Sequence, residues 1–353
     1  MHHDLMKVLR CPVTKSKLTI HILKETNGSF NDQIIPVIEE GILFAEQDWF
    51  YPLIKGIPRL CVESFLDHGD FLKNHLPDYT ARKEKLLLQY GDLLHFVLKK
   101  NKRTKKSFTL EWGLYDYEKD KTWDAGDEAM LDRFLAETGE SIASLKDKYI
   151  FDAGCGNGKL NCLLAGQGIS NIAMDFSNSI EMANRYNKSP NLHFIQGDVQ
   201  FPPVAFDYFD LVHSSGVLIA TNNTELSFSC LVPMVKSGGK LSVWLYHPRK
   251  SALHNLFNYI RSFTSKLPLR LQYYLYAVTI FPLSYCIKKI KGNPQNAREM
   301  MVDILDWFTP EFRWEHGHYE AAAWFYKRRF KNVKVTTDSM FGFNIIGEKT
   351  GAL

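Results

Sequence analysis

The chain has 353 residues, enough for one large domain or two moderate ones. A formal net charge of +4 does not require a nucleic-acid partner, and six cysteines without paired spacing argue against a disulfide framework and for a reducing compartment. The N-terminus lacks the apolar core of a signal peptide. The nearest candidate for a membrane span, residues 267–287, is interrupted by Pro268, Arg270 and Pro282, so we expect the helices of a cap. These features favour a cytoplasmic protein, and they do not indicate an oligomeric state.

Residues 1–65 are rich in turns and in short β-forming segments. Their Cys11-Pro12 opening and their close at residues 51–58 (Tyr-Pro-Leu-Ile-Lys-Gly-Ile-Pro) resemble the zinc-ribbon-like module of methyltransferase activator subunits. That module, also fused to some bacterial methyltransferases, binds zinc through two Cys-x-x-Cys pairs. The four corresponding positions here are Cys11, Thr14, Phe44 and Gln47. Because one thiol cannot hold tetrahedral zinc, we predict a metal-free module in which Phe44 packs in place of the ion. A substrate-presenting role and a simple N-terminal cap both stay open, and we predict no metal site in the chain.

Residues 66–145 are expected to form a helical connecting region that covers the cofactor, with helical apolar spacing from Phe71 to Leu98. The basic run at residues 99–106 could contact phosphate or a membrane surface, but we favour a solvated helix end. The aromatic segments at 108–115 and 122–123 either cover the cofactor or are plain core. Residues 127–138 should form the helix beside the first strand of the next domain.

The most informative segment is the glycine-rich turn after the apolar strand at residues 149–153. Its Gly154, Gly156 and Gly158 have the spacing Gly-x-Gly-x-Gly, whereas dehydrogenase loops use Gly-x-Gly-x-x-Gly. Glycines allow the backbone to approach a ligand closely, and the helix that follows offers unpaired N–H groups. With Asp152 before the first glycine, this arrangement resembles motif I of the class I S-adenosylmethionine (SAM)-dependent methyltransferases.

Four further elements follow in the order of that family. A strand ends at Asp175, and an acid about twenty residues beyond the loop can accept hydrogen bonds from both ribose hydroxyls. A third strand leads into Gly197-Asp198, a fourth follows at residues 209–214, and the turn at Ser237-Gly238-Gly239 precedes a fifth. The resemblance covers about a hundred residues. It implies that Asp198 contacts the adenine amino group, that Val199 packs on the ring, and that Ser177 caps the next helix. The cofactor residues it implies are Asp152, Gly154, Cys155, Gly156, Asn157, Gly158, Asp175, Phe176, Ser177, Asp198, Val199, Ser215 and Gly216.

The third region, residues 146–353, is predicted to be the SAM-dependent domain, with a helical lid inserted at about 250–320. The expected fold class is therefore α/β. It comprises a Rossmann-like, mostly parallel sheet with an antiparallel C-terminal hairpin, the helical lid and a small β-rich N-terminal domain. In the resembled proteins a segment like residues 306–310, together with a downstream histidine, marks the substrate side. This implies Asp306, Trp307, Phe308 and His316 as substrate-binding residues.

Methyl transfer needs in-line alignment of two reactants, and some acceptors must also lose a proton. Histidine is the usual base near neutral pH, and among five candidates we rank His318 and His247 first. The aromatic lid favours a small-molecule or lipid-like acceptor methylated at oxygen or carbon. Two alternatives stay open: a methyltransferase of tRNA, rRNA or protein, and a non-catalytic SAM-binding partner subunit. Against a nucleic-acid acceptor, the fourth strand is followed by Ser214-Ser215-Gly216-Val217 rather than an Asn-Pro-Pro-Tyr-type motif.

Overall fold

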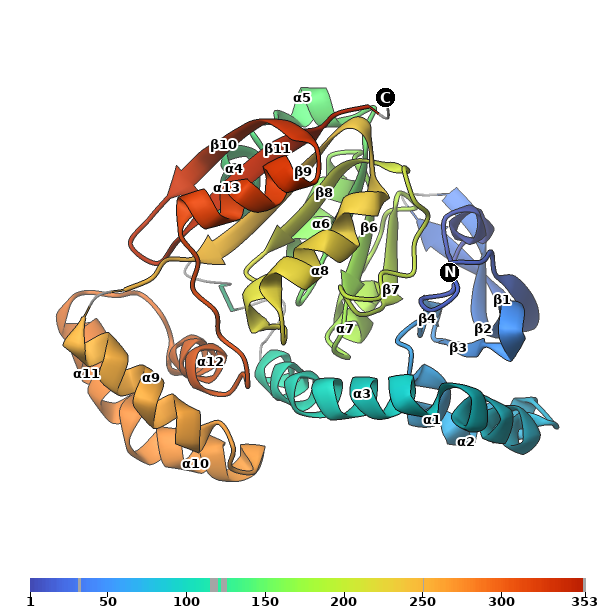
Figure 1. Cartoon of the computed structure of the whole chain (residues 1–353), viewed down its shortest axis with the longest axis horizontal. Coiled ribbons are helices and arrows are strands. Elements are labelled where there is room, and N and C mark those ends of the chain that lie inside the picture. Colours follow the sequence, from blue (N-terminus) through green and yellow to red (C-terminus); the bar gives the residue numbers. More distant parts are fainter. Residues whose placement is uncertain (31–32, 115–119, 122–125, 250, 352–353) are drawn as a thin grey trace.

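The computed structural model describes the whole chain except residues 31–32, 115–119, 122–125, 250 and 352–353, and the side chains of Trp112 and Leu253. The described residues form a four-stranded antiparallel sheet near the N-terminus and a seven-stranded mixed sheet that begins at residue 149 (Figure 1). The expected fold class is confirmed, while the division at residues 65 and 145 stays a prediction. No helix in the described part of the chain is both long and apolar enough to cross a membrane.

The N-terminal sheet has the order β1-β2-β3-β4, with β1 at Thr19–Phe30, β2 at Gln33–Phe44, β3 at Phe50–Ile54 and β4 at Ile57–Pro58. Short 3₁₀ turns lie at His3–Lys7 and Glu46–Asp48. The Cys11 thiol lies 3.3 Å from the Tyr51 hydroxyl, and Phe44 is half-buried against the main core. Gln47 accepts a hydrogen bond from Tyr90, so it serves to hold the module against the helical region. The zinc-ribbon resemblance itself stays a prediction.

The helical region begins with α1 at Ser64–Asp67 and α2 at Gly69–His75, and continues as the long helix α3 at Tyr79–Gly113. We expected helical structure from Phe71 to Leu98, and α2 and α3 cover most of this segment. The helix is interrupted at Pro77, because proline cannot donate the helical hydrogen bond. The next helix, α3, then includes the basic residues 99–106. Figure 1 shows α3 passing beneath the large sheet, from the N-terminal module toward the inserted helices.

The large sheet has the strand order β10-β11-β9-β8-β5-β6-β7. Its parallel part comprises β5 at Tyr149–Ala153, β6 at Ser170–Asp175, β7 at Leu192–Gln196, β8 at Phe209–Ser215 and β9 at Val235–Tyr246. The antiparallel hairpin is β10 at Phe330–Asp338 with β11 at Gly342–Lys349, and it pairs with β9. The chain order reverses beside β5, so its carboxyl end is a topological switch point, where such sheets bind ligands.

Helices cover both faces of this sheet (Figure 1). On one face lie α4 at Asp127–Thr138, α6 at Lys159–Gly166 and α7 at Ile180–Tyr186, and on the other α8 at Thr224–Leu231 and α13 at His318–Lys327. The predicted bounds of α4 are confirmed. Smaller elements are α5 at Ile142–Leu145 and 3₁₀ turns at Leu218–Ala220 and Val232–Met234.

The predicted insertion consists of four helices: α9 at Ala252–Thr264, α10 at Leu269–Val278, α11 at Ile280–Ile290 and α12 at Ala297–Phe308. They share a small core of their own around Tyr276, Leu305 and Phe308. Figure 1 shows them grouped at one end of the molecule, beyond the carboxyl edge of the sheet.

The N-terminal module packs directly on the large sheet. Residues 197–208, all of which the structure describes, contain no helix, and module residues occupy the space beside them. Main-chain hydrogen bonds join Leu60 to Gln196 and Arg10 to Pro203. The buried Arg59 guanidinium donates to Gln196 at 3.2 Å and to Glu181 at 2.8 Å. The module therefore shares one continuous core with the sheet.

Candidate functional site

The glycine loop after β5 fits closely against its neighbours. Gly154, Gly156 and Gly158 have φ of +100°, +56° and +67°, backbone conformations that favour glycine. A Cβ on Gly154 would lie 2.2 Å from Val217, and one on Gly158 would lie 2.6 Å from Phe194. The backbone angles thus favour glycine at all three positions, and the available space requires it at Gly154 and Gly158.

Asp175 lies at the end of β6 and faces this loop. One carboxylate oxygen accepts hydrogen bonds from the Ser177 amide and hydroxyl, both at 2.7 Å, and the other accepts from the Gly156 amide at 2.9 Å. Burial raises the pKa of Asp175, and these hydrogen bonds counter part of that effect. Ser177 was predicted to cap the next helix. That prediction is wrong, because α7 starts at Ile180 and its N-cap position is Ser179; the Ser177 hydroxyl donates to Asp175 and accepts from the Ser179 amide at 3.3 Å.

Asp198 follows β7 and is already paired. Its carboxylate accepts hydrogen bonds from Lys100 Nζ at 2.7 Å, Asn101 Nδ2 at 3.2 Å and the Gln200 amide at 2.9 Å. The Lys100 side chain is only 7% exposed. An adenine amino group would therefore share this carboxylate with the lysine.

This pairing corrects part of the interpretation of the basic run as a solvated helix end. Lys100 is buried against Asp198, Arg103 donates to the Leu267 carbonyl, and Lys105 pairs with Asp67 beside Glu63. Three of its six basic residues thus contact other parts of the molecule, because α3 crosses the cofactor side of the sheet, whereas Lys99, Lys102 and Lys106 are exposed.

Asp152, the acid before the glycine loop, belongs to a buried trio with His213 and Glu137. The His213 ring nitrogens lie 2.9 Å from Asp152 Oδ1 and 2.9 Å from Glu137 Oε2. Burial alone would lower the pKa of His213, but hydrogen bonds to the two carboxylates outweigh it and raise the pKa to about 10. His213 is thus an imidazolium at neutral pH that joins α4, β5 and β8.

One cavity of about 1770 Å³ connects the glycine loop with the inserted helices. The predicted residues on its wall are Asp152, Gly154, Cys155, Gly156, Asn157, Asp175, Phe176, Asp198, Val199, Ser215, Gly216, Asp306, Trp307 and Phe308. Gly158, Ser177 and His316 do not line it. Phe108 of the aromatic segment does, whereas residues 115–119, 122–125 and the Trp112 side chain lie outside the described residues.

At the far end of the cavity, Asp306 lies beside Tyr246 and Arg313. The Tyr246 hydroxyl is 3.4 Å from Asp306 Oδ2, and the Arg313 guanidinium lies 4.1 Å from the ring centres of both Tyr246 and Trp307. Burial, with a smaller contribution from the charge of Asp303, raises the pKa of Asp306 to about 7. A carboxylate with that pKa can exchange a proton near neutral pH.

Glu111, near the end of α3, is a second unusual acid. It is fully buried, and neither carboxylate oxygen has a hydrogen-bond partner. Burial first, and then the charges of Asp306, Asp175 and Asp303, raise its pKa far above the ordinary value. Glu111 is therefore a buried acid whose charged form is disfavoured by its surroundings.

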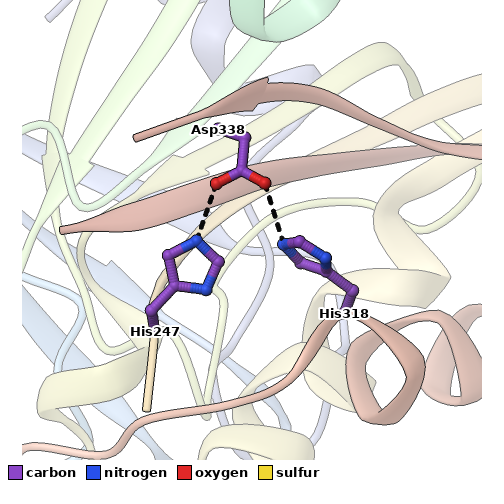
Figure 2. A group of neighbouring side chains, drawn as sticks. All are labelled: His247, His318 and Asp338. Atoms are coloured by element: carbon purple, nitrogen blue, oxygen red, sulfur yellow. Dashed lines mark hydrogen bonds and ion pairs between the residues drawn. The ribbon is translucent and has the colours of Figure 1, made fainter. Parts of the chain in front are cut away.

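The structure brings the two leading histidine candidates together, but away from the cavity wall. His247 follows β9, His318 begins α13, and Figure 2 shows the Asp338 carboxylate between their rings. Its oxygens lie 2.7 Å from His247 Nε2 and 3.4 Å from His318 Nε2. Among the described residues these three are the one group whose metal-ligand atoms all lie within 4.8 Å of one another. Neither His247 nor His318 lines the cavity, and both rings face the Asp338 carboxylate. We therefore do not retain these two histidines as the proton acceptor.

His316 is also turned away from the cavity. Its Nδ1 lies 2.9 Å from Glu320, and its ring packs edge-on against Trp324, 4.8 Å between centroids. The sequence-based reasoning also missed Lys100, Glu111, Glu137 and Arg313. Their sequence positions lie far from the glycine loop, and only the helical spacing of Lys100, Thr104 and Phe108 hinted at a shared face.

The cavity wall fits the cofactor that the sequence implied. Gly154 and Gly156 place backbone on the cavity wall, and Asp175 keeps hydrogen-bonding capacity beyond its three donors. Asp175 would hold the ribose, Asp198 and Val199 the adenine, and the loop with Ser215 and Gly216 the methionine end.

Comparison with known proteins agrees with this site. A family model described as a methyltransferase domain matches residues 151–243, the segment from β5 to β9 that contains the glycine loop, Asp175 and Asp198. No curated protein sequence matches the chain.

Similar solved structures include the magnesium protoporphyrin IX methyltransferase of Synechocystis with bound SAH. It is 15% identical, with a TM-score of 0.42 over 70% of this chain and 98% of that one. A SAM-dependent methyltransferase from Methanosarcina mazei is 18% identical, with a TM-score of 0.38 over 58% and 93% of the two chains.

Proposed function

We propose that this chain, which belongs to the SAM-dependent class I methyltransferases through its domain at residues 151–243, methylates a small-molecule or lipid-like acceptor at oxygen or carbon. The observation that carries the acceptor class is the cavity of about 1770 Å³. A pocket for one drug-sized ligand is typically about 300–1,000 Å³, so this cavity has room for the cofactor and a second molecule.

The wall opposite the glycine loop favours an apolar acceptor. The inserted helices and the loop after α12 supply aromatic and aliphatic side chains there, with polar and charged side chains such as His254, Lys288 and Asp303 interspersed among them. The apolar side chains are Phe257, Ile280, Leu283, Ile287, Ile304, Trp307, Phe308 and Phe312. The apolar side chains would bind flat or aliphatic groups by excluding water, while the polar residues would set the orientation.

SAM, when bound, supplies a methyl group on a cationic sulfur. The chain's own contribution is to align the acceptor, exclude water and take up a proton where the acceptor has one to lose. Asp306 is the group we assign to that proton, because it faces the cavity, has a pKa near 7 and is oriented by Tyr246. Asp306 is thus both an acceptor-binding residue and the proposed base.

A macromolecular acceptor is less well supported. Half of the basic run that motivated it, namely Lys100, Arg103 and Lys105, is engaged within the molecule. A nucleic acid would have to compete with Asp198 and Asp67 for those cations.

The experiment is transfer of labelled methyl from SAM to three fractions of a host extract: organic-soluble small molecules and lipids, RNA, and protein. We expect label in the organic-soluble fraction, with Asp306→Asn lowering the rate. Asp303→Asn is the comparison variant: Asp303 lines the same cavity and pairs with Lys288 at 2.7 Å, and since its charge helps to raise the pKa of Asp306, its replacement should lower the pH at which the rate rises without removing transfer. Label found only in RNA or protein would refute the proposed acceptor class.

A further inference from the structure

We infer that the outer surface of helices α9, α10 and α11 binds an anionic lipid bilayer. The helices lie at one end of the molecule, away from the N-terminal module (Figure 1). They are too short to cross a membrane, so the inference concerns a helix group that lies on the bilayer surface.

Each of the three helices exposes an apolar stripe at helical spacing. The stripes are Leu256, Tyr259 or Ile260, and Phe263 on α9; Leu271, Tyr274 and Val278 on α10; and Leu283, Ile287 and Ile290 on α11. Val278 is 73% exposed and Ile290 is 86% exposed. The solvent face of a helix in a soluble protein is normally polar, so these faces are unpartnered.

The exposed apolar residues are concentrated in this group. Of the 26 exposed large hydrophobic side chains among the described residues, 11 lie between Leu256 and Ile290. That segment is about a tenth of the chain. Scattered exposed apolar residues are ordinary, whereas a concentration of this kind indicates a binding surface.

The charges of the same segment decide between possible occupants. Residues 251–291 contain six lysine and arginine residues and no aspartate or glutamate. Lys266, Arg270, Lys289 and Lys291 are exposed. A second copy of this surface would bring cations against cations, whereas anionic lipid headgroups attract them while the apolar stripes enter the acyl boundary.

The cavity opens beside this surface. Four residues both line the cavity and are exposed: Leu283 and Ile287 on α11, and Met340 and Phe341 in the β10–β11 turn. The Arg249 guanidinium lies 4.7 Å from the Phe341 ring centre at the same rim. An apolar acceptor could thus pass from the bilayer into the cavity without crossing water. This entry route rests on the proposed function, while membrane binding itself does not.

The test is sedimentation of the untagged full chain with phosphatidylcholine vesicles, with and without phosphatidylserine, in the absence of cofactor and acceptor. The key variant is Tyr274→Ser/Val278→Ser/Ile290→Ser, whose residues do not line the cavity. The matched control is Ile34→Ser/Leu88→Ser/Tyr326→Ser, which removes three equally exposed apolar residues elsewhere. Circular dichroism of each variant checks its fold.

We expect the wild type and the control to bind the phosphatidylserine vesicles, and the key variant to lose binding. Replacing Lys266 or Lys291 with Gln should weaken binding about fivefold each, and added salt should weaken it further. Absence of wild-type binding, or equal binding by the key variant, would overturn the inference. It would also be overturned if the key variant changed only the oligomeric state measured by analytical ultracentrifugation. Since no turnover is measured, failure here leaves the proposed methyl transfer untouched.

Discussion

Replacing His213 with Gln should destabilise the fold strongly, because His213 is the one cation between two buried carboxylates. It lies 2.9 Å from both Asp152 and Glu137, and all three side chains are at most 6% exposed. Without the imidazolium, two carboxylates remain buried without a cation between them. Removing one partner of a buried ion pair typically costs about 3–5 kcal/mol.

The pKa of His213 gives an independent magnitude and a pH window. It rises from 6.5 in the unfolded chain to about 10 in the fold. That difference corresponds to roughly 5 kcal/mol of stabilisation. Because the folded pKa is the higher one, this stabilisation is complete below pH 6.5 and is lost as the pH rises toward 10. The loss should be about 1.4 kcal/mol per pH unit within that window.

The assay is urea unfolding of the wild type and His213→Gln at about pH 6.5 and about pH 9. The stability difference between them should shrink by roughly 3 kcal/mol at the higher pH. His193→Gln is the matched control. Burial first, and then nearby positive charges including His2, lower the pKa of His193 to about 3, so it is neutral throughout. A His213→Gln loss below about 1 kcal/mol, or a difference that does not change with pH, would refute this reasoning.

Three further predictions follow from single contacts. Gly154→Ala should abolish binding of S-adenosylhomocysteine, since its Cβ would lie 2.2 Å from Val217. Gly216→Ala, whose Cβ would have its nearest contact at 3.9 Å, should bind more weakly but measurably. Equal affinities of the two variants by calorimetry would contradict this. Arg59→Leu should lower the free energy of unfolding in urea by about 3 kcal/mol, because it leaves Glu181 and Gln196 without their buried partner. Lys55→Met, which removes the exposed partner of Glu181, should lower it by less than about 1 kcal/mol. For a methylated acceptor that loses a proton, kcat/KM should rise through pH 7 as Asp306 ionises, and Asp306→Asn should remove that limb; an unchanged profile would exclude Asp306 as the base.

The sequence was informative where local patterns determine the structure. The strands from β5 to β9, the glycine loop and the C-terminal hairpin follow from buried apolar runs and turn residues that are close together in the chain. Asp175 and Asp198 could be placed because the ends of parallel strands meet at one edge of the sheet.

The sequence was uninformative where distant segments meet. Lys100 approaches Asp198 because α3 crosses the sheet, and Arg59 approaches Glu181 because the N-terminal module packs beside β7. No local pattern identifies the partner in either arrangement. His247 and His318 were ranked by their positions in the sequence, whereas their approach to Asp338 depends on the hairpin and on the start of α13 (Figure 2).

The central claim is that the glycine loop and Asp175 bind the SAM cofactor. Calorimetric titration with S-adenosylhomocysteine, comparing wild type with Asp175→Ala, tests it most directly. We predict saturable binding to the wild type and a loss of about tenfold to a hundredfold in the variant, since hydrogen bonds to a charged group contribute about 1.5–3 kcal/mol. Equal affinity of the two proteins, or no binding by the wild type, would contradict the account.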